Sequence, residues 1–151
     1  MTAIGFFSLT LGTAAVVEDL TRRRISNWTS GTALVSGLTV HGFERGWHGV
    51  ATAAAGAVVG FAVFAVFYLL NGMGGGDVKL VAGFGSLLGP TTILFAAWIS
   101  AAAGGLMALA SALVLTIRRK PSGGRNTVHS GAIPYAPAIV AGVWLAEMAR
   151  G

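Results

Sequence analysis

Long apolar runs alternate with short polar links along the whole chain. A helix needs roughly 20 apolar residues to cross a bilayer core about 30 Å thick. The run from Val50 to Leu70 has that length and contains no charge, so it is the clearest predicted span. The six runs extend from about Ile4 to Val17, Trp28 to Val40, Val50 to Leu70, Val78 to Leu88, Thr92 to Ile117 and Ile133 to Met148. The pattern predicts an all-α, polytopic membrane bundle of about six transmembrane helices.

The fourth run is short for a complete span. It extends from Val78 to Leu88 and is interrupted by Gly89-Pro90. Proline lacks a backbone N–H and clashes with the preceding helical turn. The segment is therefore expected either to form a half-buried helix or to continue past the Gly-Pro break with a kink.

Composition supports membrane insertion. Of the 151 residues, 54% are hydrophobic and only 10% are charged, which exceeds the apolar content that a soluble domain of this size buries. The 23 glycines suit close helix packing in lipid. The N-terminus is apolar and lacks a basic region before its first run, so we expect a retained span rather than a signal peptide. We expect a single membrane domain over residues 1–151.

The basic residues indicate the topology. Eight lie on one predicted side and two on the other, and such an excess in short loops marks the cytoplasmic face. The eight are Arg22, Arg23, Arg24, Lys79, Arg118, Arg119, Lys120 and Arg125, and the two are Arg45 and Arg150. The predicted location is the cytoplasmic (inner) membrane, with both termini outside. The basic residues lie between apolar runs, which favours contact with lipid head groups over nucleic-acid binding.

Metal and thiol chemistry are not expected. The chain has no cysteine, which excludes disulfides and thiol catalysis. Its three histidines, His41, His48 and His129, are spread over loops on opposite predicted sides, so a shared metal site is not predicted.

The acidic residues are scarce, and two of them stand out. The five are Glu18, Asp19, Glu44, Asp77 and Glu147. An aspartate at the centre of a membrane helix costs about 2.5 to 3.5 kcal/mol, so acids in membrane segments tend to be paired or functional. Asp19 and Asp77 both lie where apolar runs end, on the same predicted side. Two carboxylates within about 3 Å cannot readily both ionise, so one acts as a base on a water and the other as an acid. This is the chemistry of an aspartic peptidase, which needs no metal or cofactor.

The spacing of the two aspartates does not by itself establish a catalytic role. Asp19 and Asp77 can equally be helix-end charges neutralised by Arg22, Arg23 or Lys79. Glu18 adjoins Asp19, and composition does not decide which of the two points inward. Gly74 and Gly76 precede Asp77 and would allow a substrate backbone to approach closely, so they are candidate substrate-binding residues.

Two motifs resemble the type IV prepilin peptidases, a family of membrane aspartic proteases. Residues 19–27 read DLTRRRISN, similar to the family's aspartate, basic loop and Ile-Pro-Asn, with Ser26 in place of the usual proline. Residues 74–80 read GGGDVKL, similar to the family's GxGD motif. A third segment, residues 133–139, resembles the Pro-(Phe/Tyr)-x-Pro start of the family's last span. The resemblance implies that Asp19 and Asp77 are the catalytic pair and that Glu18 is a bystander.

The resemblance also implies a substrate. Family members remove a short basic leader from pilin-like precursors at the cytoplasmic face. Larger members carry a cysteine-rich region associated with methylation, which has no counterpart here, so the chain is more similar to the minimal branch that serves tight-adherence (Flp-type) pili. The expected partners are a prepilin or pseudopilin and the lipid bilayer, and the oligomeric state is left open.

Alternative functions are a non-enzymatic transport or secretion-complex subunit, another GxGD protease such as an archaeal preflagellin peptidase or a presenilin-type protease, and an inactive family member. An ion carrier would place acids nearer the bilayer centre, whereas these runs are almost free of ionisable groups.

Overall fold

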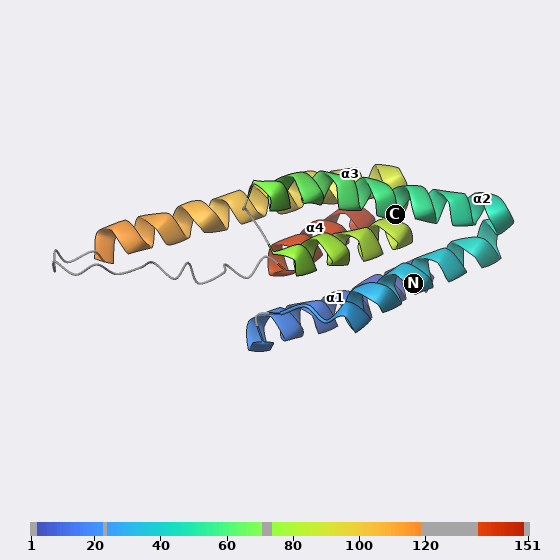
Figure 1. Cartoon of the computed structure of the whole chain (residues 1–151), viewed down its shortest axis with the longest axis horizontal. Helices are drawn as coiled ribbons and strands as arrows, with labels where there is room; N and C mark the ends of the chain where they lie inside the picture. Colours follow the sequence, from blue (N-terminus) through green and yellow to red (C-terminus); the bar gives the residue numbers. More distant parts are fainter. Residues whose placement is uncertain (1–2, 23, 71–73, 119–135, 150–151) are drawn as a thin grey trace.

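The computed structural model describes residues 3–22, 24–70, 74–118 and 136–149 (Figure 1). The described residues form four helices: α1 (Ala3–Arg22), α2 (Asn27–Leu69), α3 (Gly75–Arg118) and α4 (Ala136–Met148). The predicted all-α class is confirmed. Three of the helices, α1, α2 and the Gly75–Leu106 part of α3, are long and apolar enough to cross a membrane. The predicted count of six helices is not confirmed, because two pairs of predicted spans are each joined in one long helical element.

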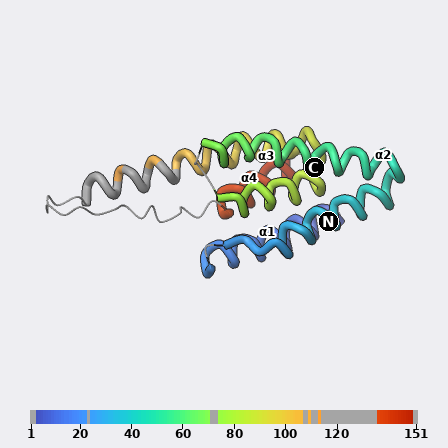
Figure 2. Tube along the Cα trace, viewed as in Figure 1, coloured from blue at the N-terminus to red at the C-terminus, as the bar shows by residue number. Residues whose placement is uncertain are grey.

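The long helix α2 reverses direction at Gly46. This residue has φ 58° and ψ −140°, backbone angles that glycine adopts readily because it lacks a Cβ. The tube in Figure 2 turns back on itself within α2. The second and third apolar runs therefore lie in α2, and the polar link predicted around 41–48 is helical apart from this one residue.

A second reversal occurs in α3 at Gly89, which has φ 77° and ψ 171° and is followed by Pro90. The residue before a proline is disfavoured in the helical region, and this positive φ is open to glycine. The predicted break at Gly89-Pro90 is thus confirmed. The fourth run forms the part of α3 before this break. Its residues Leu80, Phe84 and Leu87 are fully buried, so this short segment lies inside the bundle rather than against lipid.

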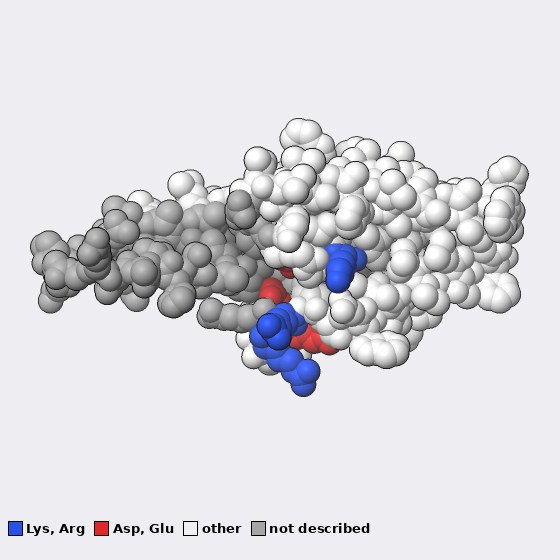
Figure 3. All heavy atoms as spheres, in the orientation of Figure 1, with Lys and Arg blue, Asp and Glu red and all other residues white. Residues whose placement is uncertain are grey.

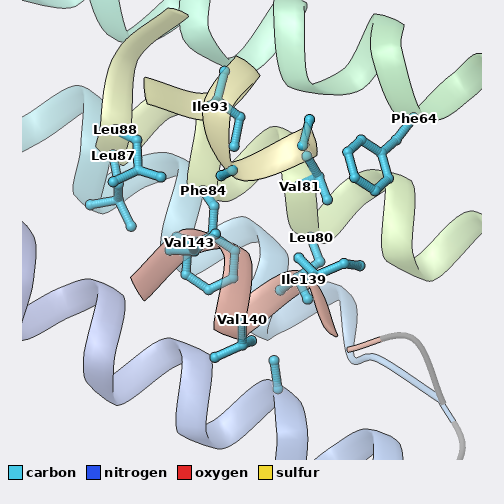
Figure 4. Packing of buried hydrophobic residues seen from close by; sticks show 14 of the residues in the cluster. Phe64, Leu80, Val81, Phe84, Leu87, Leu88, Ile93, Ile139, Val140 and Val143 are labelled. Carbon is cyan, nitrogen blue, oxygen red and sulfur yellow. The ribbon is translucent and has the colours of Figure 1, made fainter. Parts of the chain in front are cut away.

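The core forms where the first half of α3 packs against α2 and α4. Figure 4 shows Phe64 of α2, Phe84 and Ile93 of α3, and Ile139 and Val143 of α4 around one apolar centre. Each of these side chains is at most 3% exposed. The core therefore joins segments that are far apart in the sequence.

Glycines allow α2 and α3 to approach closely. A Cβ added at Gly56 would lie 2.0 Å from the carbonyl oxygen of Gly85, and one added at Gly85 would lie 2.2 Å from that of Gly56. Both distances are too short for any side chain. The backbones are in direct contact, as expected for helices that associate through small residues in lipid.

Helices α1 and α4 run antiparallel. At one end, Ser8 of α1 donates a short hydrogen bond to Glu147, and Trp144 Nε1 donates to the carbonyl oxygen of Ser8 at 3.3 Å. At the other end, α1 finishes beside the start of α4. The start of α1 and the end of α4 consequently lie at the same end of the bundle, and the starts of α2, α3 and α4 lie at the opposite end (Figure 1).

Candidate active site

Asp19 lies in the last turn of α1 and is 8% exposed. Its Oδ2 accepts a hydrogen bond of 3.1 Å from the backbone N–H of Ala136, the first residue of α4. The first N–H groups of a helix have no acceptor within the helix, so a carboxylate placed there satisfies one of them. Asp19 therefore caps α4 across the bundle.

Asp77 lies in the first turn of α3 and is 9% exposed. Its Oδ2 accepts from the N–H of Gly74 at 3.3 Å, and its own N–H donates to the carbonyl oxygen of Gly74 at 3.1 Å. These two bonds close the turn that starts α3. They also fix the backbone next to the carboxylate.

The two carboxylates lie near each other. Asp77 lies within range of the charge of Asp19, so repulsion between like charges is part of its environment. Each carboxylate also adjoins the N-terminus of a helix, α4 for Asp19 and α3 for Asp77. The positive end of a helix dipole stabilises a nearby anion, which offsets part of the repulsion. Carboxyl groups can donate protons to a water and accept protons from it, which is the chemistry available at this end of the bundle.

Glu18 has different partners from its neighbour Asp19. Its Oε2 accepts 2.9 Å hydrogen bonds from the backbone N–H of Ser26 and from Thr29 Oγ1. Both partners lie at the start of α2. Of the two adjacent acids, Asp19 is therefore directed toward α4 and Glu18 toward α2.

Lys79 is exposed, and its Nζ donates to Asn27 Oδ1 at 3.2 Å. The two aspartates accept hydrogen bonds from backbone N–H groups. On the face drawn in Figure 3, the visible acidic atoms gather at one place beside a cluster of basic atoms.

Gly74 and Gly76 flank the aspartate differently. Gly74 is exposed, and an added Cβ would lie 3.4 Å from Asp77 Oδ2, which is ordinary contact. Gly76 is partly buried, and an added Cβ would lie 3.5 Å from Ile25 Cβ. Neither has a positive φ, which among the described glycines occurs only at Gly46 and Gly89. Their substrate-binding role stays a prediction.

The two described histidines differ in burial. His41 is 3% exposed and its Nε2 lies 3.0 Å from the carbonyl oxygen of Leu87, whereas His48 is exposed. His129 lies outside the described residues, as do Arg23, Arg119, Lys120 and Arg125.

Sequence reasoning did not find the backbone partners of the acids. The N–H of Ala136 and the N–H of Ser26 carry no side-chain signature. Pro137 was an indirect sign that a helix starts near Ala136, because it lies in the first turn of α4, where proline is favoured. In the third motif, residues 133–135 lie outside the described residues and 136–139 begin α4.

The fold and the site together define an all-helical membrane protein with two buried, interacting carboxylates at one end of its bundle. Residues 6–109 match the type IV leader peptidase family, and the chain belongs to this family of proteases. The matched range contains both Asp19 and Asp77 and ends before α4. No curated protein and no solved structure matches the chain.

Proposed function

We propose that this protein is an aspartic endopeptidase whose catalytic pair is Asp19 and Asp77. The observation that supports the proposal best is that two buried carboxylates from separate helices lie within range of each other's charge at one end of the bundle. Membrane segments tolerate such acids poorly unless they are paired or functional. Membership of a leader peptidase family makes proteolysis the function that explains them.

In the proposed reaction, one carboxyl is protonated and the other is ionised. The ionised carboxylate removes a proton from a bound water as the water oxygen attacks the peptide carbonyl carbon. The protonated carboxyl donates its proton to the carbonyl oxygen. The tetrahedral intermediate then collapses: one of its hydroxyl groups returns a proton to the second carboxylate as the C=O bond re-forms, the C–N bond breaks, and the amine leaves with a proton supplied by the first carboxyl. The products are a new carboxyl and a new amine, and the pair returns to its starting protonation.

The start of α3 is suited to receive an extended substrate. Gly74 and Gly75 are exposed beside buried Asp77, so no side chain of theirs obstructs the approach of a peptide backbone. We propose Gly74 as a substrate-binding residue on this basis, and the partly buried Gly76 only because it belongs to the same glycine-rich motif. The N–H groups of Gly75 and Gly76, at the start of α3, would donate to a substrate carbonyl oxygen, because the first N–H groups of a helix lack intrahelical acceptors.

We propose short-leader prepilins or pseudopilins of the Flp type as substrates, cut at the cytoplasmic face of the inner membrane. This rests on the two sequence motifs and on family membership. Six membrane crossings with both termini outside are part of the proposal, and the reversals at Gly46 and Gly89 support it. The described basic residues Arg22, Arg24 and Lys79 belong to the aspartate end, and Arg45 adjoins the reversal in α2.

The test is co-expression with a candidate Flp-type prepilin, followed by the electrophoretic shift that leader removal produces. Asp19→Asn and Asp77→Asn should each abolish the shift. Glu44→Gln is a matched control, because Glu44 is an exposed acid near the opposite end. Full processing by either aspartate variant would overturn the proposal. Cleavage of a preflagellin but of no prepilin would overturn the proposed substrate and keep the aspartic mechanism.

A further inference from the structure

Glu18 joins the end of α1 to the start of α2. Its carboxylate is half-buried, and Oε2 accepts both the Ser26 N–H and the Thr29 hydroxyl at 2.9 Å. Thr29 is itself 8% exposed. Hydrogen bonds to a charged acceptor are stronger than neutral ones, and the carboxylate also lies at the positive end of the α2 dipole. We call Glu18, Ser26 and Thr29 the Glu18 clamp.

Ser26 contributes a group that proline would lack. Its φ of −67° and ψ of 139° are angles that proline adopts without strain. Its Oγ caps α2 by accepting from the N–H of Trp28 at 3.2 Å. A proline here would keep the backbone shape but lose the N–H that Glu18 binds. Glu18 and a non-proline residue at position 26 therefore depend on each other.

The clamped segment contacts the start of α3. Ile25 adjoins Ser26, and its Cβ, N and O lie 3.5–3.9 Å from the position of a Cβ on Gly76. Gly76 directly precedes Asp77. The path from Glu18 through Ser26 and Ile25 to Gly76 thus connects the residue beside Asp19 to the residue beside Asp77.

We infer that Glu18 is a positioning residue, whose clamp on residues 26 and 29 sets the spacing between Asp19 and Asp77. The inference rests on the proposed function and assigns a role to a residue that the sequence motifs leave aside. Glu18 touches neither substrate nor water in this role. Its effect is geometric, and displacements of about 1 Å at an acid–base pair reduce rates by up to about 100-fold.

The test measures kcat and KM for prepilin cleavage by the purified full chain. Glu18→Ala should lower kcat by about 10- to 100-fold with little change in KM, because the bound substrate meets a misplaced pair. Glu18→Gln should recover most of the rate, since its amide oxygen accepts the same two hydrogen bonds. Here kcat is expressed per folded enzyme molecule, because a residue that only stabilises the fold would lower the folded fraction and leave kcat per folded molecule unchanged.

Position 26 gives an independent test. Ser26→Ala keeps the N–H and loses only the cap, whereas Ser26→Pro loses both. Ser26→Pro should therefore lower kcat further than Ser26→Ala, and in the Glu18→Ala background it should have no larger effect than Ser26→Ala has there. If Glu18→Ala does not fold, Thr29→Val, which removes one of the two bonds at constant shape, should still give a smaller decrease in kcat.

Two results would overturn the inference. Wild-type kcat in both Glu18→Ala and Ser26→Pro would show that the Glu18 clamp does not set the spacing between Asp19 and Asp77. Complete inactivity of Glu18→Gln, equal to that of Asp19→Asn, would make Glu18 a catalytic acid. The proposed function fails separately: Asp19→Asn or Asp77→Asn would then retain activity, whatever the Glu18 variants do.

Discussion

The carboxylate of Asp19 accepts a hydrogen bond from the backbone N–H of Ala136, 117 positions later in the chain. The bond joins the end of α1 to the first residue of α4 at 3.1 Å, in a buried place. It gives the proposed catalytic residue a second, structural task. The two tasks can be separated by substitution.

Asp19→Ala should lower the free energy of unfolding by about 1–3 kcal/mol, because it leaves the buried Ala136 N–H without an acceptor. Asp19→Asn keeps an acceptor oxygen and should remain within about 1 kcal/mol of wild type while losing activity. Unfolding in mixed micelles, followed by circular dichroism, measures both. Equal destabilisation by the two variants would contradict the structural role of this hydrogen bond.

Close backbone contact makes Gly85 intolerant of a methyl group. Gly85→Ala would place a Cβ 2.2 Å from the Gly56 carbonyl oxygen, so α2 and α3 must separate. We expect a loss of at least about 1–3 kcal/mol in the free energy of unfolding. Gly31→Ala is the matched control, because nothing lies within 4 Å of its added Cβ. It should be neutral or slightly stabilising.

His41 should stabilise the break in α3. The Leu87 carbonyl oxygen can only accept, so the His41 Nε2 at 3.0 Å must carry the hydrogen. His41→Ala removes this buried donor and leaves the carbonyl oxygen of Leu87, two residues before Gly89, without it. We expect the free energy of unfolding to fall by about 1–3 kcal/mol, measured by thermal unfolding. His48→Ala, at an exposed position, should change little. Equal effects of the two substitutions would be inconsistent with this assignment.

The proposed topology can be tested with single cysteines, because the chain contains none. A charged, membrane-impermeant maleimide applied to intact spheroplasts should label Glu44→Cys. It should label Arg24→Cys and Leu70→Cys only after permeabilisation. All three positions are exposed. Labelling of Leu70→Cys from outside would mean that the second half of α2 does not cross the membrane.

The positions of the helices were largely predictable from local sequence. Each apolar run lies mainly or wholly in one of the four helices, and the Gly89-Pro90 pair marked a real break. Between the second and third apolar runs the sequence predicted a polar loop of several residues, because this stretch contains glutamate, arginine and histidine. In the structure, a single glycine with positive φ turns the chain, and its polar neighbours remain helical.

The sequence by itself determined the membrane class, the helical runs and the two motifs that contain Asp19 and Asp77. These properties are local, since they depend on apolar length, on proline and glycine geometry and on a few adjacent residues. Tertiary structure decided which acid faces which partner. Neighbouring residues on a helix point roughly 100° apart, so packing of α1 against α2 and α4 directs Glu18 and Asp19 to different partners. The same packing of the helix ends brings Asp19 and Asp77 within range of each other's charge.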